Sequence, residues 1–139
     1  MYHTSPLNSF GKILKYNRLN LGLTQTQLAS ITGVNYKSIG HYENGYCYPN
    51  KEFLNKLSLI MNINDLLIDN YLKFIYYDGL EKLIMYRKSK NLSYTQFAKI
   101  LGVSKDTIIK WESLNNSNFY LQPNTYSKIE NKLKELNIL

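Results

Sequence analysis

The 139-residue chain has little of what many secreted proteins and enzymes depend on: one cysteine, two histidines and three prolines. Because Cys47 has no second cysteine to join, an internal disulfide is excluded, which fits a reducing compartment. No apolar run reaches the roughly 18 residues that a membrane-spanning helix needs. Residues 1–10 contain no basic segment followed by an apolar one, so we expect no signal peptide and a cytoplasmic protein without membrane contact.

The sequence also lacks the residue patterns of a catalytic or cofactor site. His3 and His41 are the histidines, and the closeness of His41 to Cys47 in sequence is no evidence for a nucleophile site. No cluster has the spacing of zinc ligands, and no glycine-rich phosphate loop is present. We therefore expect no enzyme, no cofactor and no metal. The run Tyr46–Tyr48 is interpreted as loop packing.

What the chain does contain is an excess of basic charge, with a formal net charge of +7 and a pI of about 9.4. Residues 1–70 hold six Lys or Arg and four Asp or Glu, whereas residues 71–139 hold eleven and six. Net basic charge favours an anionic partner, and nucleic acid is the usual one. Charge alone does not decide the class, because many basic proteins bind nothing anionic.

An internal repeat with an offset of 69 residues organises the chain. Residues 23–34 align with residues 92–103 without a gap. The aligned pairs outside this stretch include Leu14 with Leu83, Arg18 with Arg87, Ile39 with Ile108, Tyr42 with Trp111 and Glu43 with Glu112. Two copies of one unit are therefore expected, separated near residues 63–79.

The first helix of each copy has recognisable start and stop signals. Thr24 and Ser93 are each followed three residues later by glutamine, which is the pattern of a capping box. Gly33 and Gly102 are expected to end these helices, because glycine adopts the left-handed conformation at little cost.

The second helix of each copy is expected to follow a polar cap, Asn35 or Ser104. The apolar residues expected to face inward are Leu28, Ala29, Ile31, Ile39 and Tyr42 in the first copy and Phe97, Ala98, Ile100, Leu101, Ile108 and Trp111 in the second. Together these signals predict two short helices in each copy, which cross over a turn of roughly three to four residues.

Further helices are expected on both sides of each motif. They are residues 10–21, a helix that starts at Pro49–Asn50, a segment 66–77 capped by Asn64–Asp65, residues 80–89, and a helix that starts at Pro123–Asn124. Their inward residues are expected to be Phe10, Ile13, Leu14 and Leu21, then Phe53, Leu54, Leu57, Ile60 and Met61, and finally Tyr126, Ile129, Leu133 and Leu136. No segment alternates like a half-buried strand, so the fold class is all-α.

The pattern Leu-Thr-Gln-x-x-Leu-Ala-x-x-x-Gly-Val, followed by Ile-x-x-(Tyr/Trp)-Glu, resembles the lambda-repressor-like helix-turn-helix family of Cro/cI or Xre type. The first copy matches from Arg18 to Leu57, and the second from Arg87 to Glu112. The second copy lacks the Asn-Gly that follows Glu43, and its loop from Ser113 to Gln122 is longer. The resemblance implies tandem domains at 1–64 and 79–139, the second one divergent, joined by a helical connector at 65–78.

The resemblance further implies a prokaryotic or phage transcriptional regulator, a repressor in particular, that binds double-stranded DNA in the major groove and at phosphates. It implies that Arg18 pairs with Glu43, and Arg87 with Glu112, as structural ion pairs. The DNA-binding residues that it implies are Gln25, Asn35, Tyr36, Lys37, Ser38 and His41 in the first copy and Ser104, Lys105, Asp106, Thr107 and Lys110 in the second. Gln25 is expected at a phosphate, Lys37 and His41 at base acceptors, and Asp106 at cytosine N4.

Several alternatives stay open on the sequence alone. Gly40 either permits close approach to DNA or is only tolerated. The second copy either contacts DNA or serves for packing or for binding a protein partner. The apolar residues of segment 66–77 are either buried between the repeats or form a homodimer interface. A protein-interaction module, such as an antitoxin or a phage-encoded inhibitor, and a nucleic-acid binder without sequence preference are the rival functions.

Overall fold

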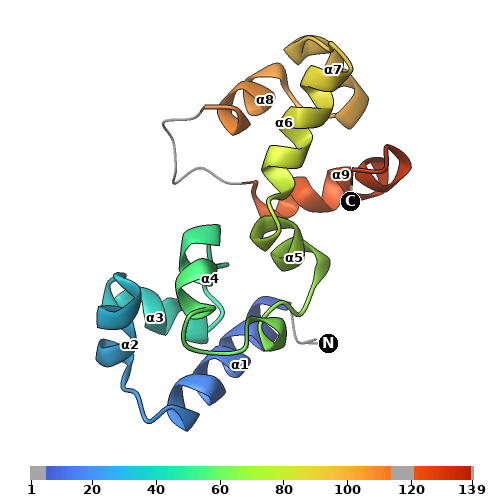
Figure 1. Cartoon of the computed structure of the whole chain (residues 1–139). Helices are drawn as coiled ribbons and strands as arrows, with labels where there is room; N and C mark the ends of the chain where they lie inside the picture. The colour runs from blue at the N-terminus through green and yellow to red at the C-terminus, as the bar shows by residue number, and fades with distance from the viewer. Residues whose placement is uncertain (1–5, 114–120, 139) are drawn as a thin grey trace. The chain divides into compact units, whose positions relative to one another are not determined.

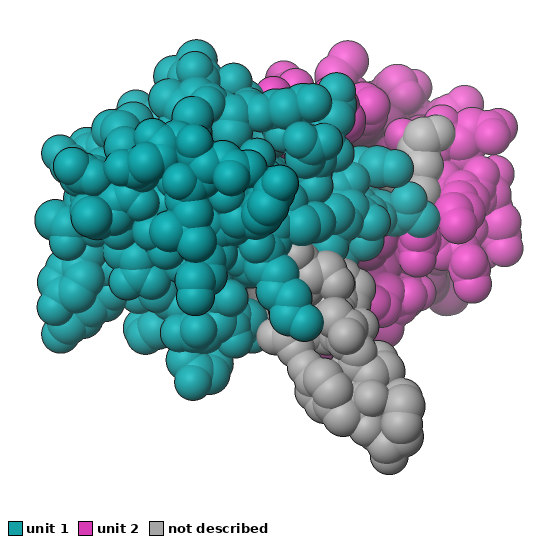
Figure 2. Space-filling model, turned by 90° about the horizontal axis from the view of Figure 1, so that it is seen from below, with its two compact units in different colours: residues 1–73 teal, residues 74–139 magenta. Residues whose placement is uncertain are grey.

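The computed structural model describes residues 6–113 and 121–138, and these residues form nine α-helices, one 3₁₀ helix and no strand (Figure 1). The all-α class expected from the sequence is therefore confirmed. The chain divides into two compact units, residues 1–73 and 74–139 (Figure 2). The division falls within helix α5 (Asn70–Tyr76). Among the described residues, no helix is both long and apolar enough to cross a membrane.

The first unit is built around a helix pair that follows a longer helix. Its elements are α1 (Pro6–Asn20), α2 (Gln25–Thr32), α3 (Tyr36–Glu43), α4 (Lys51–Leu57), the 3₁₀ helix η1 (Ile63–Asp65) and the start of α5. Helix α3 packs against both α1 and α2, and α2 also packs against α4. The fully buried side chains of this unit include Phe10, Leu14, Leu28, Ile39, Phe53, Leu54 and Leu57.

The second unit repeats the packing of the helix pair and of the helix that follows it. Its elements are the end of α5, α6 (Gly79–Ser89), α7 (Tyr94–Leu101), α8 (Lys105–Trp111) and α9 (Pro123–Glu135). Helix α7 packs against α8 and α9, as α2 packs against α3 and α4. Its core includes Leu83, Phe97, Ile108, Ile129 and Leu133. Most of the long loop expected between Ser113 and Gln122 lies outside the described residues.

Both capping boxes expected from the sequence are present. The Thr24 hydroxyl accepts from the backbone N–H of Gln27, and the Gln27 side chain accepts in return from the backbone N–H of Thr24 at 2.8 Å. Ser93 and Gln96 make the same pair of bonds in the second unit. Each box satisfies two N–H groups that a helix start otherwise leaves unpaired.

The turns between the paired helices also follow the expected chemistry. Gly33 and Gly102 end α2 and α7 in the left-handed conformation, with φ of 76° and 78°. Asn35 and Ser104 then cap α3 and α8 through their side-chain oxygens. The helix-turn-helix geometry is thus specified by short-range hydrogen bonds in both units.

Three apolar residues that we expected to face inward are exposed instead. Ile31 is 49% exposed, and Ile100 and Leu21 also lie on the surface. In α2 the buried face continues from Leu28 to Thr32, whose hydroxyl donates to the Leu28 carbonyl at 2.8 Å. Spacing of four residues therefore sets the buried face of this short helix, and the intervening apolar position points outward. Leu21 is exposed because α1 ends before it.

Other element boundaries differ from the expected ones in smaller ways. Helix α1 begins at Pro6, four residues before the expected start. Helix α4 ends at Leu57, so the half-buried Ile60 and Met61 lie beyond it. Leu136 caps the end of α9 and is half-buried, whereas Ile138 beyond it is buried.

The expected helix over residues 66–77 is wrong at its start. Asn62 caps the short helix η1, and α5 begins only at Asn70. The carboxylate of Asp69 accepts from the backbone N–H of Leu72 at 2.8 Å, which makes Asp69 rather than Asn64–Asp65 the polar residue at the start of the helix. Most of the apolar side chains in this segment are buried, namely Leu66, Leu67, Tyr71, Leu72, Phe74 and Ile75.

The loop after α3 is attached to the start of α5 by an aromatic cluster within the first unit. The Tyr48 hydroxyl donates to the Asp69 carboxylate at 3.4 Å, and the Tyr48 ring meets the Tyr71 ring edge-on at 4.9 Å. Burial, and then the negative charge of Asp69, raise the pKa of Tyr48 to about 12.

Because the folded state favours the neutral phenol, Tyr48 stabilises the fold fully below the ordinary tyrosine pKa of 10 and loses this contribution as the pH rises toward 12. We therefore expect the stability advantage of the wild type over Tyr48→Phe to shrink across this range, as measured by urea unfolding. Tyr46→Phe serves as the control for losing a hydroxyl in the same loop. A constant difference would show that Tyr48 titrates alike in the folded and unfolded chains.

A close approach of α1 to the end of α3 requires a glycine. A Cβ at Gly11 would clash with the backbone carbonyl oxygens of Tyr42 and Glu43. At Gly40, by contrast, a Cβ would meet only the side-chain amide of Gln25, at 4.0 Å. The two helical glycines therefore differ in whether the fold needs them.

We predict that Gly11→Ala lowers the free energy of unfolding by about 1–3 kcal/mol, because backbone atoms must shift to admit the methyl group. Gly40→Ala is the matched control and should raise stability by about 0.5–1 kcal/mol through the better helix propensity of alanine. Thermal and urea unfolding measure both changes. Equal effects of the two substitutions would contradict the close approach of α1 and α3.

Candidate nucleic-acid interface

Helix α3 presents a polar face to solvent and an apolar face to the core. Tyr36 is 52% exposed, and Lys37 and His41 are also exposed. Ile39 is fully buried on the opposite side. The Tyr42 ring stacks on Phe53 of α4 at 4.5 Å between ring centroids, which fixes the rotation of α3 about its axis. The side chains expected at the bases therefore share one accessible face.

A buried ion pair fixes the end of α3. The Arg18 guanidinium donates to Glu43 through Nε at 2.6 Å and through Nη2 at 3.1 Å. Its remaining nitrogen, Nη1, donates to the Leu23 carbonyl at 2.8 Å. We call this set of contacts the clamp. It joins α1, the loop before α2 and the end of α3, and it confirms the pairing that the resemblance implied.

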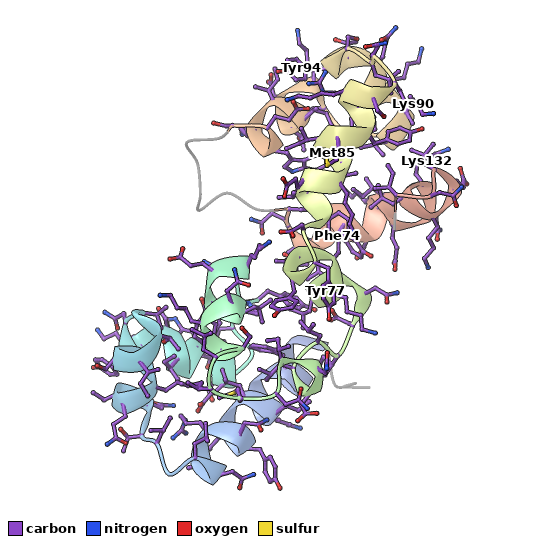
Figure 3. The ribbon with its side chains drawn as sticks, viewed as in Figure 1. Phe74, Tyr77, Met85, Lys90, Tyr94 and Lys132 are labelled. Carbon is purple, nitrogen blue, oxygen red and sulfur yellow. The ribbon has the colours of Figure 1, made fainter. Side chains whose placement is uncertain are left out.

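The second unit contains the same clamp with the same geometry. Arg87 pairs with Glu112 through Nε and Nη2, the latter at 2.7 Å, and donates to the Leu92 carbonyl at 2.8 Å. Hydrogen bonding to Glu112 raises the pKa of the Arg87 guanidinium above the ordinary value of an arginine, which is already high. The guanidinium carbon lies 4.5 Å from the centroid of the Tyr94 ring, a cation–π contact. Tyr94 is labelled in Figure 3.

Gln25 and Tyr94 occupy equivalent positions at the start of α2 and α7, and both contact the clamp. The Gln25 amide donates to Glu43 at 3.1 Å, so this side chain is held beside the end of α3. Tyr94 instead covers the arginine. Neither residue extends freely into solvent, although Tyr94 stays partly exposed.

Polar side chains at the starts of α3 and α8 are engaged in hydrogen bonds. The side-chain Oδ1 of Asn35 accepts from the Lys37 backbone N–H at 2.8 Å. The hydroxyls of Ser104 and Thr107 lie 2.8 Å apart, and Ser104 also accepts from the Thr107 N–H. Ser38 is half-buried. These expected DNA-contacting residues therefore position the helices as well as bordering their exposed faces.

Helix α8 also presents an exposed face, but its side chains differ from those of α3. Lys105, Asp106 and Lys110 are exposed, and Ile109 between them is 39% exposed. Ile108 and Trp111 are buried on the other side. In each unit, the side chains that the resemblance places at the bases thus lie together on the exposed face of their own helix.

A tyrosine of the loop after α3 lies beside the exposed His41 of that helix. Tyr46 is 75% exposed, and its ring meets the His41 ring edge-on at 5.8 Å. The run of three loop residues was interpreted as packing, which fits Tyr48 but not Tyr46. No local pattern separates the two tyrosines, because their difference arises from the position of α5.

The described residues give no support for a metal site or for a reactive cysteine. Within residues 6–113 and 121–138, no group of His, Cys, Asp and Glu could hold a metal ion. Burial raises the pKa of the half-buried Cys47, which disfavours the reactive thiolate. Every buried polar side-chain atom of these residues has a hydrogen-bond partner.

Two clamped helix pairs of this geometry define a helix-turn-helix protein. The family model described as Helix-turn-helix matches residues 14–66 and 83–115, which together make up more than half of the chain. The chain belongs to the Cro/cI-type helix-turn-helix family, and membership implies DNA binding, as in transcriptional regulators. It is a DNA-binding family rather than an enzyme family. No curated protein and no solved structure matches the chain significantly.

We predict that Glu43→Gln lowers the free energy of unfolding by about 3–5 kcal/mol, because it leaves the buried Arg18 without a counter-charge. Glu112→Gln should cost less, since the side chains of Arg87 and Glu112 are 14% and 8% exposed, against 7% and 2% for the first pair. Urea unfolding measures both.

The control is Glu135→Gln, which removes an exposed pair with Lys132 (Figure 3). It should change stability by no more than about 1 kcal/mol. A loss for Glu43→Gln as small as that of the control would show that the first clamp is not needed for the fold.

Proposed function

We propose that the chain is a sequence-specific regulator that binds double-stranded DNA and represses transcription, and that both α3 and α8 enter the major groove. The observation that carries the proposal is the contrast between the two faces of α3. Its inner face is held by the clamp and by Tyr42, whereas Tyr36, Lys37 and His41 extend into solvent. A rigid helix with exposed donor side chains is what direct base readout needs.

The charge of the chain supports a role for the second unit as well. Residues 71–139 have a net charge of +5, and Lys105 and Lys110 flank Asp106 on the exposed face of α8. Lysine side chains that neutralise phosphates supply affinity that is independent of sequence. Repression rather than activation rests on the resemblance to Cro and cI, whose type of domain the chain carries twice.

A second candidate function is binding of a protein partner through α8. It is favoured by Asp106, which would repel phosphates, and by the hydroxyls of Ser104 and Thr107, which bond each other. This function predicts that a chain with Lys105→Ala and Lys110→Ala keeps its DNA affinity and the salt dependence of that affinity. A fall in both would assign α8 to DNA.

Selection from a random double-stranded DNA pool, at physiological salt, tests the leading proposal. We predict that Lys37→Ala with His41→Ala abolishes preference for the selected site, because each base contact contributes about 1–3 kcal/mol of discrimination, or about 5- to 150-fold per contact. Affinity for unrelated DNA should fall much less. Fluorescence anisotropy with the selected site and with a scrambled site measures both.

The matched control is Lys56→Ala, which removes one exposed lysine from α4, a helix without an expected base contact. It should leave the ratio between the two sites unchanged. If the double variant kept the wild-type ratio, α3 would not be the reader of bases in the first unit.

A further inference from the structure

The two recognition helices repeat their buried faces but not their exposed ones. On the side that faces the core, Ile39 aligns with Ile108 and Tyr42 aligns with Trp111 in the repeat. The glutamates of the two clamps also align. On the side away from the core, residue type changes at four positions. The corresponding pairs are Tyr36 with Lys105, Lys37 with Asp106, Gly40 with Ile109 and His41 with Lys110.

The exchange of Lys37 for Asp106 reverses both charge and hydrogen-bonding capacity. A lysine ammonium only donates, whereas an ionised aspartate only accepts. Both residues are exposed in the first turn of their helices. Lys37 is satisfied by acceptor edges such as guanine O6 and N7, and Asp106 by an amino donor such as cytosine N4. A G·C pair carries the guanine acceptors and the cytosine amino group on opposite halves of its major-groove edge. At equivalent places in the two half-sites, Lys37 and Asp106 therefore select opposite orientations of this pair.

The exchange of Gly40 for Ile109 adds a second difference, in shape. Nothing in the first unit requires glycine at position 40, since a Cβ there would make only an ordinary contact with Gln25. Helix α3 therefore has no side chain at this position, which borders the Gln25 amide. In α8 the same place is filled by an exposed isoleucine, whose partner in the major groove is an apolar group such as the thymine methyl.

We propose that the two units select different half-sites, so that the DNA site of this chain is asymmetric and the chain binds it in one orientation. The half-site of α3 presents acceptors, with guanine at the position opposite Lys37. The half-site of α8 presents an amino donor to Asp106 and a thymine methyl to Ile109. The inference rests on the proposed function and goes further by naming the chemistry of each half of the DNA site.

Transplanting the exposed face of one helix onto the other tests the proposal. The graft variant of the full chain carries Lys105→Tyr, Asp106→Lys, Ile109→Gly and Lys110→His, which copies the α3 face onto α8. Asp106→Lys alone is the second variant, and because this residue is exposed it leaves the core untouched. Lys128→Ala, an exposed charge change on α9, is the control. Circular dichroism and thermal unfolding establish that each variant folds.

Each protein is taken through selection from the same random DNA pool. We expect the wild type and Lys128→Ala to enrich two unlike half-sites. Asp106→Lys should reduce enrichment of the α8 half-site about tenfold and leave the α3 half-site unchanged. The graft should convert the selected site into two copies of the α3 half-site.

The other outcomes distinguish a failure of the asymmetric site from a failure of the proposed regulator function. Enrichment of two identical half-sites by the wild type, or of a single half-site, would overturn the asymmetric site while leaving sequence-specific DNA binding in place. Changes in the α3 half-site caused by Asp106→Lys would overturn it as well. Absence of any enrichment, with the wild type folded, would overturn the regulator function itself and the inference with it.

Discussion

The arrangement of each unit depends on an arginine that holds three segments at once. Arg18 joins Glu43 at the end of α3 to the Leu23 carbonyl before α2, and it does so from α1. Burying such a pair is costly unless every donor and acceptor is satisfied, because both charges leave water. Here the carboxylate accepts from the guanidinium and from Gln25, and the guanidinium also donates to a carbonyl. Helix α3 is therefore fixed at its end by a contact in which every donor and acceptor has a partner.

The second unit keeps this clamp although its neighbouring residue has changed. Tyr94 stands where the first unit has Gln25, and its ring covers Arg87 instead of bonding the glutamate. The change moves the extra contact from one partner of the ion pair to the other and leaves the pair intact. Tyr94 thus contacts the ion pair of its unit, as Gln25 does in the first unit, through a different partner. It is not a sign that the second repeat has lost its structure, because α8 is still held by its own clamp and by the burial of Ile108 and Trp111.

What the sequence predicted well was local, and what it missed depended on distant contacts. The capping boxes, the left-handed glycines and the caps at Asn35 and Ser104 follow from residues within four positions of one another. The arginine–glutamate pairs span 25 residues and came only through the family resemblance. The outward position of Ile31 depends on which turn of a short helix meets its neighbour, and the need for Gly11 depends on how closely α1 approaches α3. Local periodicity carries neither kind of information, and for the same reason it did not distinguish the exposed Tyr46 from Tyr48.

Two units in one chain allow attraction and selection to be divided between them. The second half of the chain carries more of the basic charge, and phosphate contacts made by lysines hold a protein on DNA without reading its sequence. The acidic Asp106 lies on the same helix face as Lys105 and Lys110. In the proposed function, α8 would therefore combine lysines that attract DNA with a group that penalises wrong base edges. Once α3 is bound, the second unit is confined near the DNA by the covalent link, which raises its effective concentration there. A half-site that α8 would bind weakly on its own can then contribute to specificity, and the second surface is free to differ from the first.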